Sequence, residues 1–263
     1  MVMTYAPIGG QQLYYEVHGG DSRGSVIHSG VSHGGGRPLV LLHGGVLTIG
    51  LSFGPLLGPL GAGRPVIAVE LQGHGRTADT GRPMTIEALA GDVVELLDRL
   101  EIAAADLFGF SLGGLVACAV AAAAPSRVGR LIVASADPHR PPGRESVPVA
   151  DELLPTQADF EVMRDAYLAV APDPGHFEKF AARVGAMVHE VPEWTADEVR
   201  SLRAPVLLVF GDRDFSPLTD VVELYRLLPD ARVAVLPGAT HMDITRRPDE
   251  LLALITPFLD AAR

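Results

Sequence analysis

Short apolar runs alternate with longer segments along most of the chain. The runs are continuously apolar instead of switching between apolar and polar residues, which is typical of strands with both faces buried. We predict strands at residues 37–43, 64–71, 105–111, 130–137, 204–212 and 231–237.

The segments between these runs have the spacing of helices. In residues 85–100, apolar side chains recur every three or four positions, and Thr85 followed by Glu87 is typical of a helix N-terminus. Residues 115–124 and 248–262 are also predicted helices. Strands that alternate with helices indicate an α/β fold, with a mostly parallel central sheet flanked by helices.

Two segments interrupt this alternation. Residues 19–36 are polar and rich in glycine, which predicts a long flexible loop. Residues 138–202 lie between two predicted strands, are far too long for an ordinary connection, and place apolar and aromatic residues at helical spacing. We therefore expect a core made of residues 1–137 and 203–263, with residues 138–202 inserted as a helical cap.

Composition fits one large domain and disfavours several kinds of partner. With 263 residues, 48% of them hydrophobic, the chain can bury one large core. A net charge of −11 disfavours nucleic acid and anionic membranes as partners. No apolar run reaches the length of about 20 residues that crosses a bilayer, and the first residues lack the pattern of a secretory signal. We expect a cytoplasmic protein that acts on a small molecule and binds neither nucleic acid nor membrane; its oligomeric state is left open.

The pattern of cysteine, histidine and glycine indicates no bound metal or cofactor. Cys118 is the only cysteine and lies in an apolar run, so we expect a buried, inert thiol and no internal disulfide. The histidines lack the spacing of metal ligands. The glycine-rich stretches lack the preceding strand and following helix of a dinucleotide fingerprint. We therefore expect no metal and no cofactor.

A serine stands between close glycines at the junction of a predicted strand and a predicted helix. The sequence is Gly109-Phe-Ser111-Leu-Gly113, the pattern of a nucleophile elbow. The glycines leave room for strand and helix to approach, and the serine hydroxyl projects where the first amides of the helix can hold an oxyanion. The pattern alone also fits a glycine-rich turn, but its position between strand and helix favours the elbow.

Two further features fit acyl chemistry at this serine. The sequence His43-Gly-Gly45-Val46 follows the first strongly apolar run and is a loop of the kind that supplies a second oxyanion amide. His241 follows the last predicted strand, where a general base is needed. The chain order of serine, then acid, then histidine matches a hydrolase triad.

With these motifs the sequence resembles the α/β-hydrolase fold family, in particular its small serine esterases and haloperoxidase-like members with a helical cap. The resemblance covers nearly the whole chain. It implies Ser111 as nucleophile, His241 as general base, and the N–H groups of Leu112 and Gly45 as oxyanion donors, with Val46 as the fallback. The matching motifs are LLHGG (41–45), VELQGHGR (69–76), GFSLGG (109–114), FGDRD (210–214) and PGATHM (237–242).

The acid of the triad has three candidates. Asp212 and Asp214 both follow the strand after which the family usually places its acid, and the resemblance favours Asp214. Pro217 follows Asp214 sooner than in many relatives. Asp137, after the preceding strand, stands where a minority of lipases of this fold carry their acid. Asp212 and Asp137 therefore stay as alternatives.

The resemblance implies that the cap covers Ser111 and lines an apolar pocket. We expect His43 and His74 to be structural. The predicted function is a serine hydrolase that cleaves a small, largely apolar carboxylic ester or lactone through an acyl-enzyme. The candidate pocket residues are Val46, Phe160, Met163, Tyr167 and Trp194.

Other activities of the fold remain as alternatives. Serine at the elbow argues against dehalogenases and epoxide hydrolases, which place aspartate there. A non-catalytic small-molecule binding protein on the same scaffold, an acyltransferase and a cofactor-free haloperoxidase are the alternatives to ester hydrolysis.

Overall fold

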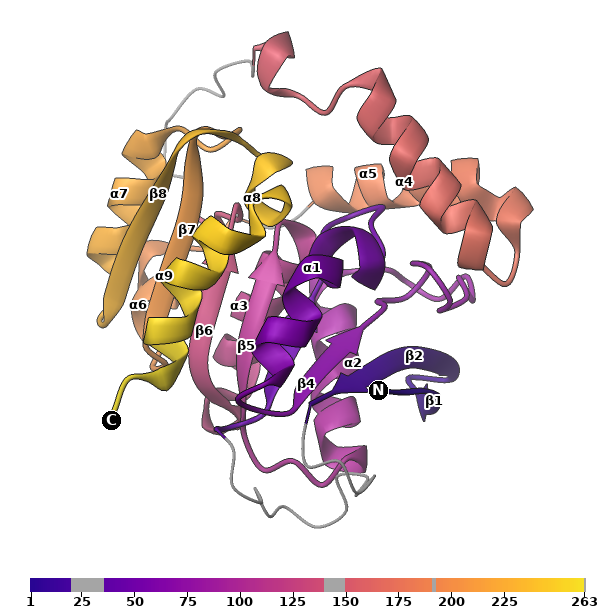
Figure 1. The fold of residues 1–263 in the computed structure, drawn as a ribbon, viewed down its shortest axis with the longest axis horizontal. Helices are drawn as coiled ribbons and strands as arrows, with labels where there is room; N and C mark the ends of the chain where they lie inside the picture. Colours follow the sequence, from indigo (N-terminus) through magenta and orange to yellow (C-terminus); the bar gives the residue numbers. More distant parts are fainter. Residues whose placement is uncertain (20–35, 140–149, 191–192, 263) are drawn as a thin grey trace.

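The computed structural model describes residues 1–19, 36–139, 150–190 and 193–262. Most of the loop predicted at 19–36, and residues 140–149 and 191–192 of the predicted cap, lie outside the described residues. The described chain forms one eight-stranded sheet with helices on both of its faces (Figure 1).

The sheet is parallel over most of its width. Strands β1 and β2 pair antiparallel, as do β2 and β4, and every other neighbouring pair is parallel. The last six strands in chain order are those that the apolar runs predict, so the predicted α/β fold is confirmed. In their order across the sheet, the strands are β1 (Val2–Ile8), β2 (Gln11–His18), β4 (Val66–Val69), β3 (Leu39–Leu42), β5 (Ala105–Phe110), β6 (Val128–Ala134), β7 (Val206–Arg213) and β8 (Ala231–Thr240).

Strand order reverses at β3. The chain leaves β3 to form β4 on one side, and later returns to form β5 on the other side. In open α/β sheets, ligands bind outside the carboxyl ends of the strands at such a reversal. The segments that follow β3 and β5 therefore meet where a site is expected.

Three parts of the sheet and its cover were not predicted: the first hairpin and two helices. The hairpin of β1 and β2 turns at Gly9 and Gly10, whose φ angles of 55° and 78° need the left-handed backbone that glycine adopts without strain. Helix α1 (Ile49–Gly61) contains Pro55 and Pro59, residues that normally end a helical pattern. Helix α7 (Leu218–Leu227) was also missed.

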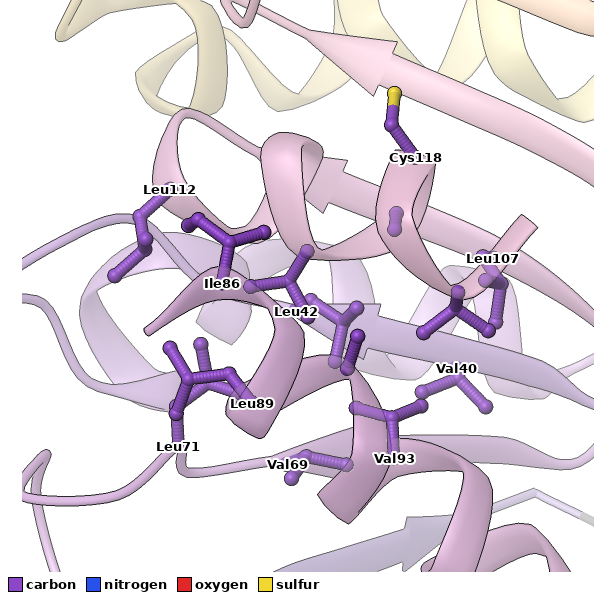
Figure 2. Close-up of a cluster of buried hydrophobic side chains, with 14 of the residues drawn as sticks. Val40, Leu42, Val69, Leu71, Ile86, Leu89, Val93, Leu107, Leu112 and Cys118 are labelled. Atoms are coloured by element: carbon purple, nitrogen blue, oxygen red, sulfur yellow. The ribbon is translucent and has the colours of Figure 1, made fainter. Parts of the chain in front are cut away.

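Helices cover the two faces of the sheet in separate layers. Helix α1 and helix α9 (Pro248–Asp260) pack on one face, and α2 (Ile86–Arg99), α3 (Leu112–Ala123) and α7 pack on the other (Figure 1). Side chains alternate along a strand, so Val40 packs toward α2 and α3, while Leu41 packs toward α1 and α9. Figure 2 shows the layer of α2 and α3, with Val93 of α2 beside Val40 and Leu89 beside Leu71. Each large apolar side chain buried in this way contributes about 1.5–3 kcal/mol.

The segment between β6 and β7 is helical where the structure describes it, as its spacing predicts. Helices α4 and α5 lie beyond the carboxyl ends of the strands (Figure 1). The division of the chain into core and cap stays a prediction. The elements of this segment are η2 (Asp151–Leu153), α4 (Gln157–Val170), η3 (Pro174–His176), α5 (Phe177–His189) and α6 (Ala196–Ser201), and the remaining short helices of the chain are η1 (Pro125–Arg127) and α8 (Asp243–Arg246).

Asp79, in the loop after β4, ties α5 to the sheet. Its carboxylate accepts hydrogen bonds from Arg183 and from Nε2 of His176, the latter at 2.9 Å. Arg183 also donates to the carbonyl oxygen of Arg82 at 2.8 Å. Burial on its own raises the pKa of Asp79, but the hydrogen bonds from Arg183 and His176 outweigh burial and hold that pKa well below its usual range.

No helix in the described ranges combines the length and apolar character that crossing a membrane requires.

Candidate active site

Ser111 stands on a sharp turn between β5 and α3. Its backbone has φ 52° and ψ −120°, a left-handed conformation that is rare for residues other than glycine. The turn is tight, since a Cβ atom at Gly109 would lie 2.1 Å from the carbonyl oxygen of Gly113, and one at Gly113 would lie 2.0 Å from that of Leu42. The two glycines therefore let α3 start directly against β3 and β5, with the serine at the corner.

His241 and Asp214 meet at Ser111 although they come from different parts of the chain. His241 follows β8, and Asp214 follows β7. The Ser111 hydroxyl donates to Nε2 of His241 at 3.0 Å, and Nδ1 of His241 donates to Oδ1 of Asp214 at 2.8 Å. This network assigns the proton of the neutral ring to Nδ1, which leaves Nε2 free to accept the serine proton.

The Asp214 carboxylate is buried and accepts three hydrogen bonds. Beside the bond from His241, Oδ1 accepts the N–H of Phe215 at 2.7 Å, and Oδ2 accepts the hydroxyl of Ser135 at 2.5 Å. Burial raises the pKa of Asp214, but the hydrogen bonds from His241, Ser135 and Phe215, with the charge of His241, outweigh burial and lower that pKa. Asp214 is therefore ionised at neutral pH.

The two alternative acids lie elsewhere. Asp212 is exposed and accepts the N–H of Gly238 at 2.6 Å. Asp137 accepts the N–H of His139 at 2.9 Å. The place beside Nδ1 of His241, which an orienting acid must take, is filled by Asp214. Of the three candidate acids, Asp214 is the one whose carboxylate bonds to His241.

Two backbone N–H groups beside Ser111 are available to an oxyanion. Leu112 is the first residue of α3, so its N–H has no partner within the helix. Across the part of the chain that the structure describes, no acceptor faces the N–H of Leu112 or of Gly45. A Cβ atom at Gly45 would lie 3.8 Å from Cβ of Leu112, so the two residues are neighbours in space. The N–H of Val46, the fallback donor, instead binds Nε2 of His74 at 3.1 Å.

Comparison with known proteins identifies the family of the chain. The model of the alpha/beta hydrolase family matches residues 39–254. This part of the chain runs from β3 into α9 and includes Ser111, Asp214 and His241. The chain belongs to the alpha/beta hydrolase family.

Individual members of the family resemble the chain to different extents. A pimeloyl-[acyl-carrier protein] methyl ester esterase of Neisseria meningitidis is 30% identical over 230 residues, which cover 79% of this chain and 72% of the esterase. The crystal structure of an enol-lactonase from Burkholderia xenovorans shares the fold, with a TM-score of 0.72 and 23% identity, and covers 98% of this chain and 100% of the lactonase. An acetyltransferase component of the acetoin cleaving system of Pseudomonas putida is 46% identical over 105 residues, which cover 39% of this chain but only 28% of that longer protein.

Two buried histidines support the loop that carries Gly45, in agreement with their predicted structural role. Nδ1 of His43 donates to the carbonyl oxygen of Gly44 at 2.8 Å, and Nε2 accepts the N–H of Leu71 at 3.1 Å. Burial lowers the pKa of His43 to about 4, so its ring is neutral. His74 holds the N–H of Val46, and burial, with the nearby His43, lowers its pKa well below the usual value.

The five pocket candidates differ in how deeply they are buried. Met163 and Tyr167 are buried on α4, and Trp194 and Val46 are half-buried. Phe160 is the exception and does not fit an enclosed pocket, since 49% of it is exposed. The spacing of three and seven residues correctly places Phe160 on one stripe with Met163 and Tyr167. However, Phe160 lies in the first turn of α4, and burial of that stripe starts only one turn later.

Sequence reasoning missed two residues beside the site and two contacts that α5 makes there. The ring of Phe215 stacks on that of His241, with centroids 4.0 Å apart and an angle of 11°. Ser135 donates to Asp214 from the end of β6. On α5, Val184 contacts Gly45 and the ring of Phe180 packs on that of His74. Only Phe215 carries a sequence signal, as the neighbour of the predicted acid.

Proposed function

We propose that this protein is a serine hydrolase that cleaves the ester bond of a small, largely apolar carboxylic ester or lactone through an acyl-enzyme. The observation that carries the proposal is the continuous chain of hydrogen bonds from Ser111 through His241 to Asp214, at a left-handed turn. Such an arrangement activates a hydroxyl that is otherwise a weak nucleophile.

In the first half of the proposed reaction, Nε2 of His241 takes the hydroxyl proton as Oγ of Ser111 bonds to the carbonyl carbon of the ester. The carbonyl oxygen becomes an oxyanion, which the N–H groups of Leu112 and Gly45 hold. Donors of this kind each contribute about 3 kcal/mol in serine hydrolases. When the oxyanion collapses, the bond to the alkoxy group breaks, and the leaving oxygen takes the proton from His241.

In the second half, a water molecule gives a proton to Nε2 of His241 and attacks the acyl carbon. A second oxyanion forms and collapses, the bond to Oγ breaks, and Ser111 recovers its proton from His241. Asp214 stays ionised in both halves and stabilises the positive ring that forms each time. The carboxylic acid then leaves and the resting enzyme is restored.

The residues around the site favour an apolar acyl group. Val184 of α5 lies beside Gly45, since a Cβ atom at that glycine would be 3.0 Å from its side chain. Phe180 of α5 contacts the ring of His74, and Tyr167 of α4 stacks on Phe180 with centroids 5.1 Å apart. Apolar walls with a few fixed polar groups are typical of sites for small apolar ligands. The name of the Neisseria relative, an esterase, supports the same class of bond.

A substrate panel tests the proposal most directly. We expect the wild type to hydrolyse p-nitrophenyl esters of short apolar acids, lactones or both, and Ser111→Ala to lose at least about 10⁴-fold in kcat. A fluorophosphonate probe should label the wild type at one residue, Ser111, and leave Ser111→Ala unlabelled. Mass spectrometry of the labelled peptide identifies the residue.

The same experiment separates the alternatives. A binding protein would bind esters without turnover and would not react with the probe. An acyltransferase would form a new ester or amide when an alcohol or amine competes with water, and a haloperoxidase would need peroxide and halide for its product. Turnover that persists in Ser111→Ala would contradict the proposed mechanism.

A further inference from the structure

Ser135, directly after β6, shares a positive φ angle with Ser111, directly after β5. Both serines have a φ of 52°, and each directly follows a parallel strand. Ser135 is only 5% exposed. A left-handed conformation is costly for serine, and such residues gather at functional sites.

Hydrogen bonds connect this strand end to both sides of the candidate site. The carbonyl oxygen of Ala134 accepts the N–H of Ser111 at 2.8 Å, and the N–H of Ser135 donates to the carbonyl oxygen of Val209 at 2.9 Å. The Ser135 hydroxyl donates to Oδ2 of Asp214 at 2.5 Å. The last residue of β6 and the residue after it thus hold the nucleophile turn and the acid.

From this geometry we propose that Ser135 is a positioning residue, whose hydroxyl fixes the Asp214 carboxylate so that Oδ1 faces Nδ1 of His241. The rotation of an aspartate carboxylate about its last bond is loosely restrained by the side chain itself. The N–H of Phe215 and Nδ1 of His241 both bind Oδ1, so Ser135 supplies the bond at the other oxygen. Without it, Oδ2 loses its buried donor, and the plane of the carboxylate is less well defined.

The pH dependence of activity can test the hydrogen bond from Ser135 to Asp214, because few charged groups in the described part of the chain surround that carboxylate. Among the residues that the structure describes, His241 is the titratable side chain bonded to Asp214. The nearby carboxylates of Asp212 and Asp137 face the N–H groups of Gly238 and His139 instead. Loss of a donor to a carboxylate makes that carboxylate more basic. The acid side of the pH profile of kcat/KM, which reports the coupled pair of Asp214 and His241, should therefore move to higher pH when the Ser135 hydroxyl is removed.

The kinetic test compares Ser135→Ala with Ser135→Gly and rests on the proposed function. Both variants lack the hydroxyl, and glycine also relieves the left-handed backbone, so a loss common to both comes from the missing hydrogen bond and not from folding. We expect kcat to fall about tenfold in both, the effect of one hydrogen bond to a charged group, with KM within about twofold of the wild type. The acid limb of kcat/KM should rise in both variants. Ser216→Ala is the matched control, because the Ser216 hydroxyl has no partner in the described chain.

A spectroscopic test stays valid even if the protein hydrolyses no ester. The proton on Nδ1 of His241 should give a low-field NMR signal in the wild type, assigned by its loss in His241→Gln. We expect this signal to shift or broaden in Ser135→Ala and Ser135→Gly and to stay in place in Ser216→Ala. The proposal is overturned if both Ser135 variants keep the wild-type signal, or if an active wild type and both variants share the same kcat and acid limb. An inactive wild type that retains the signal overturns the proposed function alone.

Discussion

The sheet and the segment between β6 and β7 both reach the candidate site, but they are held in different ways. Ser111, Asp214 and His241 all follow strands of the sheet, and the glycines around Ser111 leave no space for even one more carbon atom. Helix α5 instead meets the site through side chains, and Asp79 ties it to the loop after β4. In the proposed mechanism, the reacting groups thus depend on backbone packing, whereas the proposed surroundings of the substrate depend on side-chain contacts that substitutions can change more easily.

This contrast has a physical reason. A proton transfer needs its donor and acceptor held to within about 0.5 Å of the productive geometry, a precision that strand ends in a packed sheet can provide. A pocket for an apolar group needs area and shape, which helix side chains can supply in many combinations. Loss of a group in the sheet should therefore act on kcat, and a change in α5 should act on KM.

The largest expected effect tests the sheet side. Asp214→Asn keeps the shape of the side chain but removes the charge that stabilises the positive His241 ring and sets its tautomer. We expect kcat to fall about 10⁴-fold with little change in KM, because the same replacement lowers kcat by that factor in the Ser-His-Asp triad of an unrelated fold. Steady-state kinetics on the best ester of the panel measures this.

Asp212→Asn and Asp137→Asn are the controls for that prediction. Neither carboxylate bonds to His241, so both variants should keep kcat within about threefold of the wild type. If Asp212→Asn lost as much kcat as Asp214→Asn, the acid would be wrongly assigned. The controls have the same change of charge, which rules out a general electrostatic effect.

The next largest effect compares a glycine of each region. A Cβ atom at Gly113 would lie 2.0 Å from the carbonyl oxygen of Leu42 and 2.7 Å from that of His43, so α3 would have to move away from β3. We expect Gly113→Ala to lower the free energy of unfolding by about 3 kcal/mol, at the upper end of the cost of overpacking. Urea denaturation followed by circular dichroism measures it.

Gly185 on α5 is the matched glycine of the helical segment. It is exposed within the helix, and a Cβ atom there would touch no atom within 4 Å. Gly185→Ala should therefore raise the free energy of unfolding by about 0.5–1 kcal/mol through helix propensity alone. Equal destabilisation by both substitutions would contradict the difference in packing between the two regions.

The same contrast explains what the sequence could and could not predict. The buried strands and Ser111 carry local patterns, because burial on both faces and a tight strand-to-helix turn each demand particular residues. Asp212 and Asp214 are two residues apart after one strand, and only the turn that follows decides which carboxylate reaches His241. Ser135 has no local signal, since its left-handed backbone and its bond to Asp214 come from β6 and β7 packing side by side.

On the helical side, the packing partners of each residue were harder to foresee. The spacing in residues 138–202 predicts helices, and the described part of this segment contains α4, α5 and α6. Spacing places Phe160, Met163 and Tyr167 on one stripe, but the length of the surface underneath decides that only the last two are buried. That surface belongs to other elements, such as α5, whose Phe177 and Phe180 pack on Tyr167, and the spacing within α4 does not report it.

The last prediction tests how Asp79 holds α5. The folded Asp79 has a pKa below the unfolded value of about 3.9, so its carboxylate stabilises the fold above that pH and stops doing so as the pH falls through the lower folded pKa. Asp79→Asn should lower the free energy of unfolding by about 2 kcal/mol at pH 7, the effect of losing hydrogen bonds to a buried charge. The gap between variant and wild type should narrow below about pH 4.

The kinetic effect of Asp79→Asn decides whether α5 serves the substrate side of the site. Because α5 carries Val184 beside Gly45 and Phe180 beside His74, a looser α5 should raise KM about threefold and leave kcat nearly unchanged, a loss of binding shared by ground state and transition state. Asp173→Asn is the control, since Asp173 caps η3 nearby through the N–H of Gly175 and does not bond to Arg183. A fall in kcat at constant KM would instead place α5 with the sheet, as a part of the chemistry, and the division of roles between the two regions would fail.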